Sequence, residues 1–161
     1  MIKLLTVFFL FINCSFLYAE KGSFSMSGTG LANMDVIKQG NNKFSIVDVK
    51  NSTVVYDATG NLFKIGDIFM SSGVGMVKQI NDKFNLEFYS IAVKDGDSKS
   101  RLFMRFERKV GDLSSAKQGD GKAFITGGTG VYANISGTCS YSVKYYEKGA
   151  QTARMSCNYS N

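Results

Sequence analysis

The stretch Phe84–Glu107, with the sequence FNLEFYSIAVKDGDSKSRLFMRFE, decides the fold class of this chain. Apolar and polar residues alternate in Phe84–Tyr89 and again in Leu102–Glu107, which is the period of a β-strand that buries one face. Asp95-Gly96-Asp97 lies between the two runs and carries the Asp-Gly signal of a tight turn. The stretch therefore predicts an antiparallel hairpin with one buried face. The residues predicted on that face are Leu86, Phe88, Leu102, Met104 and Phe106.

The opposite face of the same hairpin carries charges. Glu87, Arg101 and Arg105 alternate with the apolar set, so their side chains are expected in water. The two arginines are expected to form a solvent-exposed face. The alternative is that they bind an anionic cell surface. Two alternatives also stay open for the buried face. It either fills the interior completely or lines a cavity for one small apolar ligand.

The rest of the chain has the composition of an all-β protein. It contains no proline, 17 glycines, 13 phenylalanines and 8 tyrosines. Turn signals such as Gln39-Gly40-Asn41-Asn42 and Gly119-Asp120-Gly121 separate short alternating runs. This regular spacing favours a sandwich or a closed barrel, with no helix longer than a turn. The further strands predicted are Ser23–Leu31, Lys43–Lys50, Thr53–Asp57, Asn61–Met70, Gly75–Ile80, Lys122–Thr126, Gly137–Glu147 and Ala150–Tyr159.

The N-terminus has the organisation of a secretory signal peptide. Lys3 supplies a positive charge, the run Leu4–Ile12 is apolar, and Ala19 offers a small residue for cleavage. We predict a signal peptide at residues 1–19 and one domain at residues 20–161, exported to the periplasm or the extracellular space. The apolar run is too short for a transmembrane span, which needs about 20 apolar residues, and none is predicted in the mature chain. The alternative is a lipoprotein acylated at Cys14.

Two cysteines, Cys139 and Cys157, stay in the predicted mature chain. Lys148 lies midway between them, and a hairpin centred there pairs Tyr146 with Ala150 across a short loop. The same register places the two cysteines directly opposite one another, within reach of a disulfide. Because an oxidising compartment preserves such a bond, we predict a disulfide that staples the last hairpin.

The composition and the motifs exclude several chemistries. The chain has no histidine, which removes Ser-His-Asp and Cys-His catalysis and the imidazole ligands of catalytic zinc sites. Gly127-Gly128-Thr129-Gly130 lacks the helix that follows a phosphate-binding loop, and Asp95-Gly96-Asp97 lacks the further ligands of a calcium loop. No cofactor, metal site or catalytic residue is predicted. The net charge of +6 does not indicate a nucleic acid partner in an exported chain.

Residues 124–138, FITGGTGVYANISGT, resemble the GGTGxYxxIxGxGxY run of small secreted bacterial proteins with an allene-oxide-cyclase-like (dirigent-like, calycin-type) barrel. Val93–Asp97 and Leu102–Phe106 are similar to the hairpin of the same group. The resemblance covers residues 70–159 well and residues 23–69 loosely, and the chain departs from the pattern at Cys139. It implies a single antiparallel eight-stranded barrel with a central cavity. It implies no site residue, because no working residue of the plant cyclases or of dirigent proteins can be matched here.

The leading functional hypothesis is a non-enzymatic exported protein whose barrel binds a small apolar or amphipathic molecule. One alternative, taken from the resemblance, is an allene-oxide-cyclase-like or dirigent-like cyclase or isomerase. Another alternative is a surface or assembly protein that uses its basic face or forms a homo-oligomer. A fold by itself does not choose among these functions.

Overall fold

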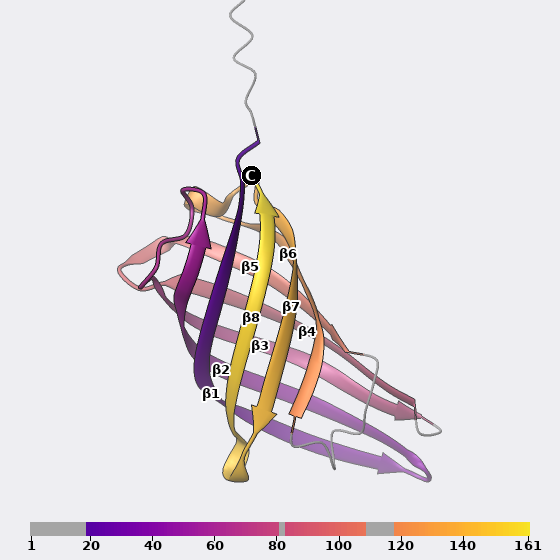
Figure 1. Ribbon diagram of the computed structural model, residues 1–161. Helices are drawn as coiled ribbons and strands as arrows, with labels where there is room; N and C mark the ends of the chain where they lie inside the picture. Colours follow the sequence, from indigo (N-terminus) through magenta and orange to yellow (C-terminus); the bar gives the residue numbers. More distant parts are fainter. Residues whose placement is uncertain (1–18, 81–82, 109–117) are drawn as a thin grey trace, which may run out of the picture.

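Figure 1 shows the computed structural model, which describes residues 19–80, 83–108 and 118–161. Eight antiparallel strands follow one another around a closed barrel, and the last strand pairs with the first. The prediction of an all-β, eight-stranded antiparallel barrel is therefore confirmed. The strands are β1 (Lys21–Gln39), β2 (Asn42–Thr59), β3 (Ile68–Ile80), β4 (Lys83–Lys94), β5 (Asp97–Arg108), β6 (Gln118–Gly128), β7 (Ser136–Tyr145) and β8 (Ala150–Ser160).

Nearly all of the predicted signal peptide, residues 1–19, lies outside the described structure. Residues 1–18, which include the alternative acylation site Cys14, lie outside the described residues. In the described ranges, no helix is long and apolar enough to span a membrane. The helical segments there are single 3-10 turns, η1 (Gly130–Tyr132) and η2 (Glu147–Gly149).

The N-terminal half of the barrel has fewer and longer strands than the sequence predicts. The predicted strands Lys43–Lys50 and Thr53–Asp57 are one continuous β2. Asn51, which lies between them, pairs with Gly30 on β1 and with Ser71 on β3. Neighbouring strands on both sides thus hold a polar segment in an extended conformation that its own β-propensity does not favour.

A loop closes one end of the barrel with aromatic side chains. The predicted strand Asn61–Met70 is wrong over its first part, because residues 61–67 form this loop and β3 begins only at Ile68. Phe63 is 1% exposed and stacks on Phe24, with ring centroids 3.9 Å apart. We call the cluster at this end the aromatic plug. Its members are Phe24, Phe63, Phe69, Tyr132 and Tyr159.

The central hairpin turns inward the face that its alternation predicts, and a bulge between Val93 and Lys94 shifts the pairing of its two strands. Phe88 pairs with Phe106, and the turn lies at Asp95-Gly96. Arg105 lies on the outer surface, where its guanidinium is 2.6 Å from the carboxylate of Glu107. Successive side chains of a strand point to opposite faces, so the residues on either side of Arg105 along β5 point into the barrel. The inward residues of this hairpin include Leu86, Phe88, Leu102, Met104 and Phe106.

The last hairpin also follows the register expected from the cysteine spacing. The backbone N–H of Tyr146 donates to the carbonyl of Ala150 at 2.8 Å. Cys139 and Cys157 are directly paired, and a disulfide joins them, with an S–S distance of 2.02 Å and Cα atoms 4.0 Å apart. Lys148 and Gly149 have φ values of 57° and 77°, so the loop turns through two successive left-handed residues.

The glycine-rich run forms a corner between β6 and β7. The hydroxyl of Thr129 donates to the carbonyl of Lys99 at 2.7 Å and accepts from the backbone N–H of Arg101 at 3.1 Å. These bonds tie the corner to β5, and they direct Tyr132 into the aromatic plug. The following η1 is a single 3-10 turn, so the run is a corner between two strands and does not lead into the helix of a phosphate-binding loop.

Candidate functional site

The barrel interior is hollow beside the aromatic plug. A cavity of about 100 Å³ is lined by residues of β2, β3, β4, β5, β7 and β8, and a second lobe of about 70 Å³ extends toward the plug. The two lobes share several lining residues and therefore adjoin. The shared residues are Asn51, Ser71, Ser90, Phe106, Tyr141 and Ala153.

One wall of the cavity is apolar. Phe88 and Phe106 meet edge to face with ring centroids 5.6 Å apart, and Phe106 meets Tyr141 in the same way at 5.3 Å. Leu86 and several valines extend this wall. Gly73 on β3 makes room for the Phe88 ring, since a Cβ there would lie 2.5 Å from the end of the ring. Gly75, the register partner of Phe88, makes room for the base of the same side chain, so two glycines of β3 accommodate Phe88.

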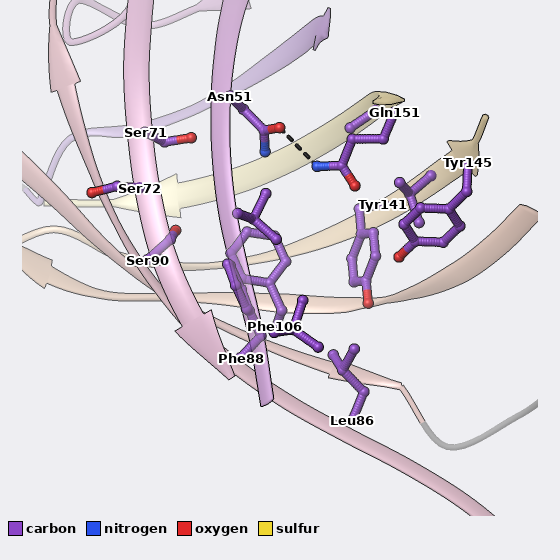
Figure 2. Close-up of a pocket in the computed structure, with 15 residues that line it drawn as sticks. Asn51, Ser71, Ser72, Leu86, Phe88, Ser90, Phe106, Tyr141, Tyr145 and Gln151 are labelled. Carbon is purple, nitrogen blue, oxygen red and sulfur yellow. Dashed lines mark hydrogen bonds between the residues drawn. The ribbon is translucent and has the colours of Figure 1, made fainter. Parts of the chain in front are cut away.

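The other wall is polar. Asn51 on β2 accepts a hydrogen bond of 2.7 Å from the side-chain nitrogen of Gln151 on β8 (Figure 2). Ser71 and Ser90 add hydroxyl groups from β3 and β4. The cavity therefore offers a flat apolar surface on one side and neutral hydrogen-bonding groups on the other, which is the usual make-up of a small-molecule site.

Proton transfer by the cavity lining is disfavoured at neutral pH. Among the described residues that line the two lobes there is no Asp or Glu. Burial raises the pKa of Tyr141 to about 12, and burial also raises the pKa of Tyr145. Both phenols therefore stay protonated at neutral pH and act as hydrogen-bonding groups rather than as bases.

The five residues predicted on the inner face of the central hairpin all lie at this cavity. Leu86, Phe88 and Phe106 line the first lobe. Leu102 and Met104 line the second lobe, together with Phe106. The sequence left open whether these side chains fill the interior completely or line a cavity. A cavity lies beside them, and the aromatic plug fills only one end of the barrel.

Sequence reasoning missed the polar wall. Asn51 falls between two predicted strands, so it had no expected orientation. Tyr141 and Gln151 could have been found from the predicted disulfide, because inward residues recur at every second position. Counting by two from Cys139 reaches Tyr141, and counting back by two from Cys157 reaches Gln151.

The Asp95-Gly96-Asp97 turn and the arginines of the outer face lie away from the cavity and make local contacts. The carboxylate of Asp97 accepts from the backbone N–H groups of Lys99 and Ser100, each at 3.2 Å. Hydrogen bonding from the Ser100 side chain, assisted by these amides, lowers the pKa of Asp97. In the part of the chain that the structure describes, no three Cys, Asp or Glu side chains gather as a metal site. On the outer face, Arg105 is offset by Glu107, while Arg101 remains exposed.

Comparison with known proteins supports the fold and leaves the site unassigned. No protein-family model and no curated protein matches the sequence. A solved structure of a pterocarpan synthase dirigent protein is similar, with a TM-score of 0.52 and 13% sequence identity. The match covers 89% of this chain and 93% of that chain. At this level of identity the likeness shows the fold alone, and the chain has a dirigent-like eight-stranded antiparallel barrel.

Proposed function

We propose that this is an exported, non-enzymatic protein that holds one small apolar or amphipathic molecule inside its barrel. The observation that carries the proposal is the cavity beside the aromatic plug, with Phe88 and Phe106 on one wall and Asn51 and Gln151 on the other. An eight-stranded barrel is just wide enough to hold one small ligand when its interior is not filled by side chains. Small inward residues such as Ser71 and Ser90 leave that space here.

A second candidate is a cyclase or isomerase that acts on a molecule held in the same cavity. The likeness to a dirigent protein whose name includes a synthase activity supports this candidate at the level of the fold. General acid–base catalysis needs a group whose pKa lies near the working pH. The described lining offers the phenols of Tyr141 and Tyr145, whose pKa values are raised away from neutrality. Binding without chemistry is therefore the better-supported function.

The experiment measures binding of toluene to the purified protein by calorimetry and by ligand-observed NMR. We expect saturable binding to the wild type and loss of binding in Phe106→Trp, because the larger side chain occupies the space that both lobes share. The matched control is Phe103→Trp, the same substitution on the outward side of the same strand. Equal binding of toluene to both variants, or a wild type that binds neither toluene nor the ring compounds of similar size, benzamide and benzoate, would overturn the proposal.

Export is tested separately by N-terminal sequencing of protein recovered from the periplasm or the medium. A mature chain that begins at Glu20 supports cleavage after Ala19. Acylation of Cys14 at a new N-terminus would instead place the protein on a membrane. Recovery of the uncleaved chain from the cytoplasm alone would contradict export.

A further inference from the structure

An amide pair bridges three strands at the polar wall of the cavity. Asn51 and Gln151 are 100 residues apart in the chain, and their side chains are hydrogen-bonded at 2.7 Å. Gln151 is only 5% exposed, so its amide is withdrawn from bulk water. Burying an amide is costly unless its hydrogen-bonding groups are satisfied. What the remaining groups of the pair can bind is therefore informative about the ligand.

Each of the two amides keeps one group that the mutual bond does not use. A primary amide has an acceptor oxygen and a donor nitrogen. The mutual bond uses the oxygen of Asn51 and the nitrogen of Gln151. The nitrogen of Asn51 and the oxygen of Gln151 are left, and Figure 2 shows both turned to the same side of the bond, toward the cavity. If both amides were turned over, the roles would exchange and one donor would still lie beside one acceptor.

A glycine on β1 allows this arrangement. Gly30 is the register partner of Asn51 on one side and of Gln151 on the other. A Cβ at Gly30 would collide with the side-chain oxygen of Asn51 and with the carbonyl of Lys50. The two amides can meet across β1 only because this position has no side chain. The pair is thus built into the barrel wall by three strands.

The rest of the cavity sets the size of the ligand and offers it an apolar surface. The larger lobe, about 100 Å³, is on the scale of the roughly 150 Å³ cavity that holds a benzene ring. Phe88 and Phe106 offer their rings to an apolar body. No Asp or Glu of the described chain lines the lobes, whereas Arg154 lines the second lobe. The buried Arg108 acts on Tyr141 and Tyr145 and lowers the pKa that burial raises. The neutral class of the ligand therefore follows from the amide pair, which presents one donor beside one acceptor.

We infer that the ligand is a small neutral ring compound with an amide, lactam or imide edge, and that this edge is read by Asn51 and Gln151. The inference rests on the proposed binding function and assigns the chemical class of the ligand. The acceptor of such an edge receives a hydrogen bond from one amide, and its N–H donates to the other. The apolar body then lies against the Phe88 and Phe106 wall.

The test compares three probes of similar size by calorimetry at neutral pH: toluene, benzamide and benzoate. Benzamide has the neutral edge, toluene lacks it, and benzoate has an anionic group with no donor. We expect benzamide to bind at least about tenfold more tightly than either of the others, because it alone can satisfy both remaining groups of the amide pair.

The decisive variant replaces both amides, Asn51→Leu with Gln151→Met. Replacing both partners leaves no unsatisfied polar group in the wall, so the fold is retained. We expect toluene binding to persist and the preference for benzamide to disappear. Asn158→Leu, which removes an exposed amide from β8, is the matched control and should keep the preference.

The outcomes separate the two proposals. Toluene binding without a preference for benzamide, or a preference that survives in the double variant, overturns the amide-edge inference and leaves the binding function standing. Benzoate binding as tight as benzamide binding overturns the neutral class. Failure of all three probes to bind the wild type overturns the binding function, and the inference with it.

Discussion

The two halves of the barrel are built from the same strands, yet one is solid and the other is hollow. On β3, Phe69 is fully buried in the aromatic plug, whereas the next inward positions are Ser71 and Gly73 at the cavity. On β8, Tyr159 lies in the plug and Gln151 lies at the cavity. The alternation of inward and outward residues is the same in both halves. The size of the inward residues decides whether a small barrel is filled or keeps a space for a ligand.

The largest difference between the halves is expected on removal of a ring. Phe63→Ala deletes the centre of the plug, where the ring contacts four others, and should cost about 3–5 kcal/mol of unfolding free energy. Phe106→Ala enlarges an existing cavity and should cost roughly 1.5 kcal/mol, at the low end for burial of such a side chain. Urea unfolding measures both. Equal costs would show that the cavity half is packed as tightly as the plug.

The disulfide belongs to the solid half and should have the next largest effect. Replacing Cys139 and Cys157 together by alanine releases a cross-link between residues 18 apart, which costs on the order of 3 kcal/mol in the chain-entropy account. Thermal unfolding of the double variant measures the loss. Replacing Ser140 and Ser156, the next cross-strand pair on the outer surface, is the matched control and should change stability little. A double cysteine variant with an unchanged melting temperature would contradict the prediction.

Alkaline pH should lower the free energy of unfolding through a tyrosine of the cavity half. This effect is smaller than the previous two and is confined to a narrow pH range. Burial raises the pKa of Tyr141 from 10.0 to about 12. The unfolded chain therefore loses this proton before the folded chain does. The stability that the neutral phenol contributes is complete below about pH 10 and is lost between about pH 10 and pH 12. Unfolding measured across this range should be less pH-dependent in Tyr141→Phe. An identical profile in the variant would show that another group is responsible.

The smallest effect is expected at a hydroxyl inside the plug. The Tyr132 hydroxyl is buried and finds no hydrogen-bond partner among the described residues. Tyr132→Phe should therefore leave stability unchanged or raise it by up to about 1 kcal/mol. The hydroxyl of Tyr159 donates to the carbonyl of Thr59 at 3.2 Å, so Tyr159→Phe should lose about 1 kcal/mol. Chemical denaturation compares the two. A clear loss in Tyr132→Phe would show that this hydroxyl has a partner.

Much of the β4–β5 and β7–β8 architecture could be predicted because it depends on residues near one another in the chain. Alternation in Leu102–Glu107 sets which side chains face inward, and Asp95-Gly96 sets the turn. The spacing of Cys139 and Cys157 about Lys148 sets the register of the last hairpin. In the last hairpin the short loop also specifies the register. In β4–β5 a bulge shifts the pairing between Val93 and Lys94, so the inner face follows from the alternation of residues and not from the turn.

The plug loop and the continuous β2 could not be predicted in this way. Phe63 lies in an apolar stretch that looks like a strand, and only the open end of a closed barrel gives it a site to cover. Asn51 breaks the local β-pattern, and it is held in β2 by pairing with both neighbouring strands. These features follow from contacts between segments that are distant in the sequence.

The alternation period, the turn residues and the cysteine spacing are enough to predict that this chain is all-β, which hairpin faces turn inward and which cysteines pair, because all three are local properties of the chain. Closure of the barrel, by pairing β8 with β1, determines which inward residues from distant parts of the chain come into contact. Gly30 on β1 lies between Asn51 and Gln151 only because β8 returns to pair with β1. The amide pair, and the cavity it faces, are products of that long-range pairing, which no local pattern encodes.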